Sequence, residues 1–121
     1  MKPGIFRYDK EKEYFFKEGC WINELCNRDD DPDLSVAKAT VSPGNTTHWH
    51  RLHGTIERYV ILEGEGVVEV GELSPQIVVT GDVVLIPSGC WQRIRNNGKR
   101  NLVFLALCTP RFNESVYEEE V

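Results

Sequence analysis

Hydrophobic and polar positions alternate with a period of two along most of the chain. Because successive side chains of a strand point to opposite faces, this alternation predicts half-buried β-strands. Turn-forming residues interrupt the pattern about every 8–12 residues, which is typical of all-β proteins. The segments expected to form strands are 19–26, 35–41, 46–52, 56–62, 66–70, 76–80, 83–86, 90–95 and 102–108.

So many short strands favour an all-β fold, either an antiparallel barrel or a two-sheet sandwich, in one domain spanning residues 1–121. Helix signals are weak. The charged and aromatic segment 8–17 predicts a short turn or an edge segment. The acidic tail 113–121 predicts a solvated C-terminus.

The composition argues against two classes of binding partner. The net charge is −5 and basic residues do not cluster, so neither nucleic acid nor an anionic membrane is an expected partner. No apolar run approaches the roughly 20 residues of a membrane span, and the N-terminus lacks the apolar region of a signal peptide. We therefore expect a cytoplasmic protein whose four cysteines are reduced thiols.

All three histidines of the chain lie close together, at positions 48, 50 and 53, and Glu57 follows them. Imidazole and carboxylate groups together suit divalent transition metals. His48 and His50 are two residues apart and would share one face of a strand, whereas plain alternation points His53 outward. A hairpin would bring Glu57 alongside the first two histidines. The cluster thus predicts a metal site.

The spacing around this cluster is specific. The segment 44–64 contains Gly44, His50, Leu52, Glu57 and Gly64, and the gaps between them are five, one, four and six residues. This pattern resembles the first motif of the cupin family, whose form is G-x5-H-x-H-x(3,4)-E-x6-G. Leu52 occupies the position of the second histidine.

A second cupin-like motif follows in the segment 81–96. The family form is G-x5-P-x-G-x2-H-x3-N, and Gly81, Pro87, Gly89 and Asn96 occupy the matching positions. Gln92 replaces the histidine. The resemblance implies a single jelly-roll-like cupin barrel made of antiparallel strands.

The same resemblance implies a metal site altered at two positions. His50 and Glu57 carry over unchanged, and Gln92 offers an amide oxygen. We expect His48 to replace the imidazole that Leu52 lacks; His53 is the alternative if a bulge turns it inward. The predicted ligands are thus His48, His50, Glu57 and Gln92, which favour Mn(II), with Fe(II) or Ni(II) also suitable.

The implied function is a metal-dependent enzyme of the dioxygenase, isomerase or decarboxylase type, acting on a small polar organic molecule that Tyr59 helps to orient. Two alternatives stay open: a non-catalytic module that binds a metal or a small molecule, and a metal-free barrel that serves as an oligomeric interaction unit. Gln92 would then only form hydrogen bonds inside the barrel. The resemblance also implies a homodimer that pairs edge strands, for which the segment 19–26 is a candidate.

Overall fold

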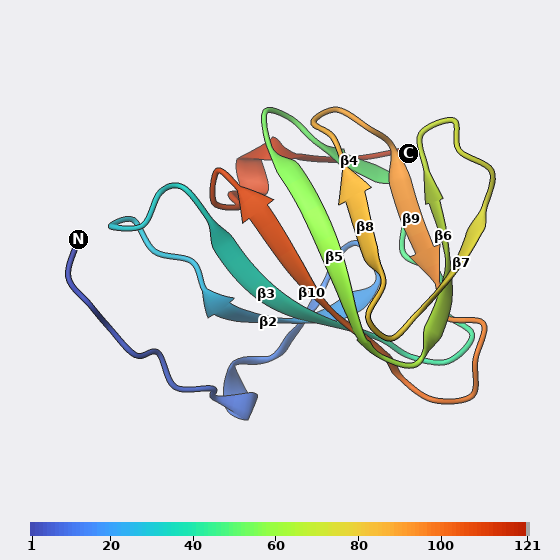
Figure 1. Ribbon diagram of the computed structural model, residues 1–121, viewed down its shortest axis with the longest axis horizontal. Coiled ribbons are helices and arrows are strands. Elements are labelled where there is room, and N and C mark those ends of the chain that lie inside the picture. Colours follow the sequence, from blue (N-terminus) through green and yellow to red (C-terminus); the bar gives the residue numbers. More distant parts are fainter. Residues whose placement is uncertain (121) are drawn as a thin grey trace.

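The computed structural model describes residues 1–120. In this range two antiparallel sheets pack face to face (Figure 1). The first has the order β1 (Tyr14–Phe16), β2 (Cys20–Cys26), β3 (Ser35–Val41), β10 (Leu102–Thr109), β5 (Ile56–Glu63) and β8 (Val83–Ile86). The second has the order β11 (Tyr117–Glu119), β4 (His50–Leu52), β9 (Gln92–Arg95), β6 (Glu65–Val70) and β7 (Gln76–Val79). Two 3-10 turns, η1 (Lys10–Lys12) and η2 (Glu114–Val116), lie outside the sheets.

The all-β fold class is confirmed, and each predicted strand has a counterpart close to its expected position. Over the described residues the two sheets do not close into one hydrogen-bonded barrel. The largest difference in length is at β4, which begins at His50 rather than at Thr46. Thr46 forms an isolated bridge to Arg95, so the chain between it and β4 is irregular.

The two terminal segments differ in how well the sequence predicted them. The segment 8–17 contains η1 and the edge strand β1, as the prediction of a turn or an edge segment allowed. The prediction of a solvated tail was wrong, because β11 pairs with β4 through Tyr117↔Leu52 and Glu119↔His50. The aromatic ring of Tyr117 packs on the rings of His50 and Phe16, and this packing outweighs the acidic character of the tail. Val121 of the predicted tail lies outside the described residues.

The segment 19–26 was a candidate edge strand for pairing with a second chain, and this prediction was wrong. The corresponding strand, β2, lies between β1 and β3 and forms hydrogen bonds with both. Its backbone groups are therefore already paired. The homodimer itself stays a prediction.

One end of the space between the sheets is apolar and sealed, and we call it the closed end. Its side chains come from both sheets and are almost inaccessible to solvent: Val41, Ile61, Ile94 and Leu102. Burial of such side chains contributes about 1.5–3 kcal/mol each to the stability of the fold.

Two motif residues hold the backbone together at the closed end. The buried Asn96 amide donates hydrogen bonds to the carbonyl oxygens of Val41, at 2.8 Å, and Arg100, at 2.7 Å. Gly64 has a φ of +80°, and a Cβ atom there would lie 2.6 Å from the carbonyl oxygen of Asn101. Only glycine accepts both this conformation and this close approach. These two motif positions therefore serve the fold.

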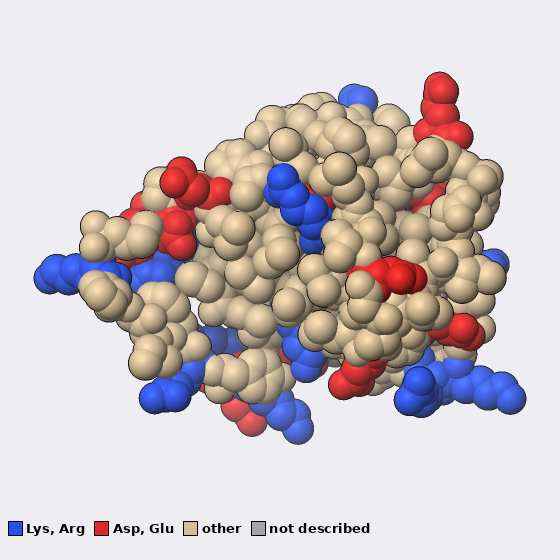
Figure 2. All heavy atoms as spheres, in the orientation of Figure 1, with Lys and Arg blue, Asp and Glu red and all other residues tan. Residues whose placement is uncertain are grey.

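Figure 2 shows basic and acidic side chains scattered over one face of the molecule, both at its rim and near its centre. Val83 and Leu85 of β8 are exposed apolar residues. Among residues 1–120, no helix has the length and apolar character needed to cross a membrane.

Candidate functional site

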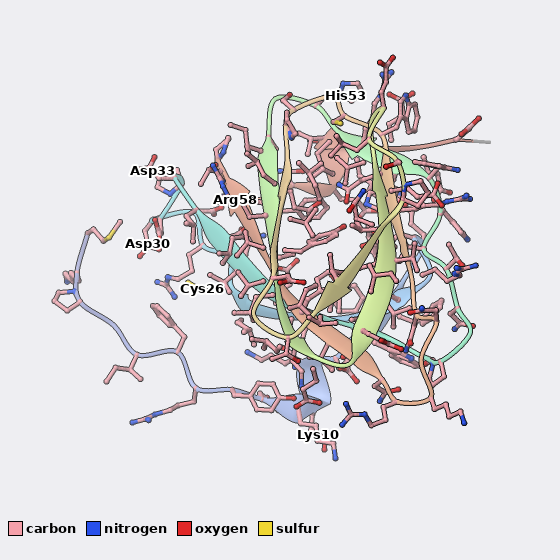
Figure 3. The ribbon with its side chains drawn as sticks, turned by 45° about the vertical axis from the view of Figure 1, so that its right-hand side comes forward. Lys10, Cys26, Asp30, Asp33, His53 and Arg58 are labelled. Carbon is pink, nitrogen blue, oxygen red and sulfur yellow. The ribbon has the colours of Figure 1, made fainter. Side chains whose placement is uncertain are left out.

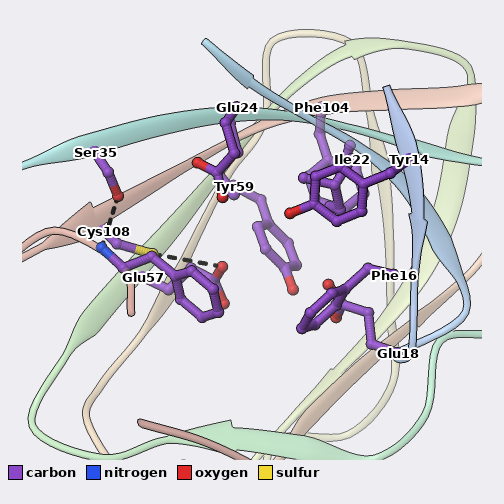
Figure 4. A pocket seen from close by; sticks show the side chains of 14 residues that line it. Tyr14, Phe16, Glu18, Ile22, Glu24, Ser35, Glu57, Tyr59, Phe104 and Cys108 are labelled. Atoms are coloured by element: carbon purple, nitrogen blue, oxygen red, sulfur yellow. Dashed lines mark hydrogen bonds between the residues drawn. The ribbon is translucent and has the colours of Figure 1, made fainter. Parts of the chain in front are cut away.

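The opposite end of the space between the sheets holds a cavity that opens to solvent, and we call it the open end. The enclosed space is small, about 40 Å³ for the centres of water-sized molecules, and the empty volume reaches about 470 Å³ only when the mouth and the adjoining solvent are included. Figure 4 shows side chains from β1, β2, β5 and β10 pointing into it. Aromatic and acidic groups form much of the wall, among them Tyr14, Phe16, Glu18, Glu24, Glu57 and Tyr59.

A chain of hydrogen bonds links the two sheets beside this cavity. Glu57 and Tyr59 are two residues apart on β5, so both point inward. The Gln92 amide nitrogen on β9 donates to Oε1 of Glu57 at 2.7 Å, and the Gln92 amide oxygen accepts from the Tyr59 hydroxyl. Both ends of the buried amide are thus satisfied, and Gln92 holds Glu57 in place.

The second carboxylate oxygen of Glu57 is less strongly bound. Oε2 accepts from the Cys108 thiol at 3.8 Å, and a thiol is a weak donor. Burial raises the pKa of Glu57 to about 7, and the nearby Glu18 carboxylate adds to this rise, while the charge of His50 and the hydrogen bonds from Gln92 and Cys108 oppose it. Glu57 therefore exchanges a proton near neutral pH.

Glu18 reaches the site from the turn between β1 and β2. Gly19, the next residue, has a φ of +100°, which allows the chain to reverse there. The backbone N–H of His48 donates to the carbonyl oxygen of Glu18 at 2.7 Å and fixes the turn against the irregular chain just before β4. The Glu18 carboxylate then lies 3.0 Å from Nε2 of the buried His50.

Both ring nitrogens of His50 face acceptors. Nδ1 donates to the carbonyl oxygen of His48 at 2.6 Å, and Nε2 donates to the Glu18 carboxylate. A ring that donates from both nitrogens is an imidazolium. Burial lowers the pKa of His50, but the Glu18 carboxylate outweighs this effect and raises the pKa to about 9. The ring of Tyr117 stacks on the His50 ring, with centroids 5.4 Å apart.

The other two histidines lie on the surface. The His48 side chain is 56% exposed and its Nδ1 lies 3.3 Å from the Glu119 carboxylate. It does not share the inward face of His50, because regular strand geometry begins only at His50 and the buried residue before it is Thr47. His53 pairs with Glu118 at the outer edge of the molecule (Figure 3).

The structure thus brings His50, Glu57, Gln92 and Tyr59 together and leaves out His48. We tested whether the donor atoms fit a metal ion. Nε2 of His50 carries a proton toward Glu18, and the Gln92 oxygen accepts from Tyr59. Among residues 1–120, no three His, Cys, Asp or Glu side chains are grouped as a metal site requires. The predicted ligand set therefore does not fit, and Mn(II) stays a prediction from the motif.

Sequence reasoning missed Glu18. This residue lies outside both motifs, in a region where the hydrophobic pattern gives no sign of a site. Gly19, the residue that follows it, was expected to begin the strand 19–26, so the turn at Glu18 was not predicted either. Leu52, at the position of the missing motif histidine, is buried and pairs with Tyr117.

The match to known families agrees with this architecture. A model of the cupin domain matches residues 37–108, which is more than half of the chain. This chain belongs to the cupin family. The resemblance seen in the two motifs is therefore confirmed.

Three similar proteins place this cupin among its relatives. An uncharacterized protein of Methanocaldococcus jannaschii is 32% identical over 119 residues, covering 93% of this chain and 91% of the relative. An oxalate-binding protein of Thermotoga maritima is 38% identical over 72 residues, covering 59% of this chain and 58% of the relative. The solved structure of KdgF from Halomonas sp. has a TM-score of 0.77 at 16% identity, covering 93% and 99% of the two chains. The last likeness concerns the fold alone.

Proposed function

We propose that this cupin binds a small organic molecule at the open end and transfers protons to and from it, with Glu57 as the general acid and base. The observation that carries the proposal is the buried carboxyl of Glu57, held at one oxygen by Gln92 and lining a cavity that opens to solvent. The oxalate-binding relative supports the binding of a small molecule in this fold.

The surroundings of Glu57 suit proton transfer. A carboxyl group with a pKa of about 7 is present in both protonation states at neutral pH, and a catalytic acid or base works best under this condition. Gln92 and Tyr59 fix its orientation through their hydrogen bonds. Such a group can remove a proton from a carbon next to a carbonyl and return it elsewhere, as in an isomerisation. It can also protonate a hydroxyl that leaves as water.

The buried pair of His50 and Glu18 has a different role in this proposal. Each partner neutralises the other, and the His48 carbonyl and the Tyr117 ring fix the imidazolium. Because a dry site responds strongly to fixed charge, the pair influences how readily Glu57 loses its proton. We assign His50 and Glu18 as positioning residues.

Two other functions stay predictions. A non-catalytic binding module would use the same cavity without proton transfer. A metal-dependent enzyme, expected from the motif, would need His50 to lose a proton and turn away from Glu18, and Gln92 to release Tyr59. Metal-free proton transfer, binding without catalysis and metal-dependent catalysis can be distinguished by experiment.

The test is hydrogen exchange into candidate substrates. Small keto and hydroxy compounds are incubated in D2O with protein treated with EDTA, and deuterium incorporation is followed by proton NMR. We expect exchange into at least one compound, a rate that depends on a group with a pKa near 7, and a loss of about 10²-fold or more in Glu57→Gln. His48→Gln is the matched control and should keep the rate.

Three outcomes would contradict the proposal. Exchange that appears only when Mn(II), Fe(II) or Ni(II) is added would favour the metal-dependent enzyme. Binding without exchange would favour the non-catalytic module. An undiminished rate in Glu57→Gln would remove Glu57 from the chemistry.

A further inference from the structure

The wall of the cavity carries three acidic side chains, Glu18, Glu24 and Glu57, and the described lining residues include no lysine or arginine. Figure 4 shows the three carboxyl groups arranged around the same space. The imidazolium of His50 compensates Glu18 from behind the wall. A molecule in the cavity therefore meets an excess of negative charge whenever Glu24 or Glu57 is ionised.

The cations nearest the mouth are already paired. Lys17 lies 3.1 Å from the Glu114 carboxylate. The Arg111 guanidinium donates to Asn27 at 2.7 Å and also pairs with Asp29. Both are therefore engaged by acidic partners. Burial raises the pKa of Glu24, and the hydrogen bonds from Asn27 and Tyr14 and the charge of Arg111 oppose this rise.

Aromatic rings complete the wall. Tyr14, Phe16 and Phe112 line the cavity, and the ring of Phe16 meets each of the other two edge to face. Faces of such rings attract cations. Phe16 shows this attraction, because the Lys17 ammonium lies over its ring, 5.8 Å from the centroid. Carboxylates and aromatic rings around one small space are the groups that recognise an organic ammonium ion.

We propose that the open end selects a small organic cation, such as an amine, over a carboxylate of the same size. The inference rests on the proposed function in that it concerns the ligand of the same cavity. It separates this chain from its oxalate-binding relative, because oxalate is a dianion and would meet the carboxylates of the wall. Glu24 is the specificity-determining residue, since its carboxylate belongs to neither the Glu57–Gln92 nor the His50–Glu18 pair.

The test compares ligands that differ in charge and hardly in size. Propylammonium, 1-propanol and propanoate, with oxalate as a fourth probe, are titrated into the EDTA-treated protein at neutral pH. Binding is followed by NMR through the methyl groups of Ala37, Ala39 and Ala106, which line the cavity. We expect propylammonium to bind about tenfold or more tightly than propanoate, with propanol between them, because like charges repel in a poorly hydrated site.

Two variants test whether Glu24 causes the preference for a cation. Glu24→Gln keeps the shape of the side chain and should lower the affinity for propylammonium several-fold while leaving that for propanol unchanged. Glu72→Gln changes the net charge equally at an exposed loop position and should change neither affinity. An equal effect of the two variants would assign the preference to overall charge and overturn the role of Glu24.

Failure of this inference is distinguishable from failure of the proposed function. Tighter binding of propanoate or oxalate, equal affinity for all probes, or methyl signals that do not respond to any of them would overturn the preference for cations. Glu57-dependent exchange in D2O is measured separately and can persist in any of these cases. Loss of that exchange with the ammonium preference retained would overturn only the proton transfer.

Discussion

The two ends of the space between the sheets are built from the same strands but have opposite character. β5 places Ile61 at the closed end and Glu57 at the open end, and β9 likewise places Ile94 and Gln92. At the closed end, apolar side chains fill the interior. At the open end, charged and amide groups are buried in pairs beside a cavity.

The comparison shows how stability and chemistry are divided in this small protein. Buried apolar groups stabilise the fold without any need for partners. Buried polar groups are tolerated only when each has a partner, and they keep unusual pKa values as a result. Changes at the closed end should therefore affect mainly stability, whereas changes at the open end should affect mainly how stability and binding depend on pH.

We expect the largest loss of stability from a substitution at the closed end. Ile94→Ala removes a fully buried side chain and should lower the free energy of unfolding by about 4 kcal/mol. Urea denaturation measures this loss. The pKa of Glu57 should stay unchanged in the variant, and a shift in that pKa would show that the two ends are coupled.

The closed end is also the part that the sequence predicted best. The hydrophobic pattern located the strands β5, β9 and β10, and the motif glycines support the tight turns between strands. At the open end the motif identified His50, Glu57 and Gln92. Strand alternation placed His48 wrongly, because the chain is not a regular strand before His50. Glu18 reaches the site through tertiary packing of a turn, which neither period nor motif encodes.

The next largest effect is the dependence of stability on pH that Glu57 causes. In the unfolded chain this carboxyl ionises near pH 4.5, whereas in the folded protein its pKa is about 7. Between these values the unfolded state has lost a proton that the native state still holds, so stability falls as pH rises. The fall should be about 3 kcal/mol.

Glu57→Gln should remove this part of the pH dependence, so that the variant becomes more stable than the parent near pH 7 and above. Urea denaturation of both proteins between pH 4.5 and 8 measures the difference. Parallel curves for the two proteins would contradict the raised pKa of Glu57.

A smaller loss is expected when the link between the sheets is cut. Gln92→Leu leaves Oε1 of Glu57 and the Tyr59 hydroxyl without their partner and should lower the free energy of unfolding by about 1–3 kcal/mol. Because the amide favours the ionised form of Glu57, its loss should also raise the pKa of that carboxyl further. Gln76→Leu, at an exposed position of β7, is the control and should be nearly neutral.

The smallest effect is expected at the surface histidine. His48→Ala removes an exposed pair with Glu119 and should change stability by less than about 1 kcal/mol. The affinity for added Mn(II), measured by calorimetry, should also be unchanged. A large loss of Mn(II) affinity in this variant would restore His48 as a ligand and show that the open end rearranges around a metal.

The most direct test of the proton-carrying site is a titration of Glu57 itself. Protein labelled with ¹³C at glutamate side chains and treated with EDTA is followed by carboxyl NMR, with Glu57→Gln used to assign the signal. We predict a midpoint near pH 7 for the folded, metal-free protein. A midpoint near the ordinary value of about 4.5 would contradict the proposed role of Glu57 as the acid and base of the site.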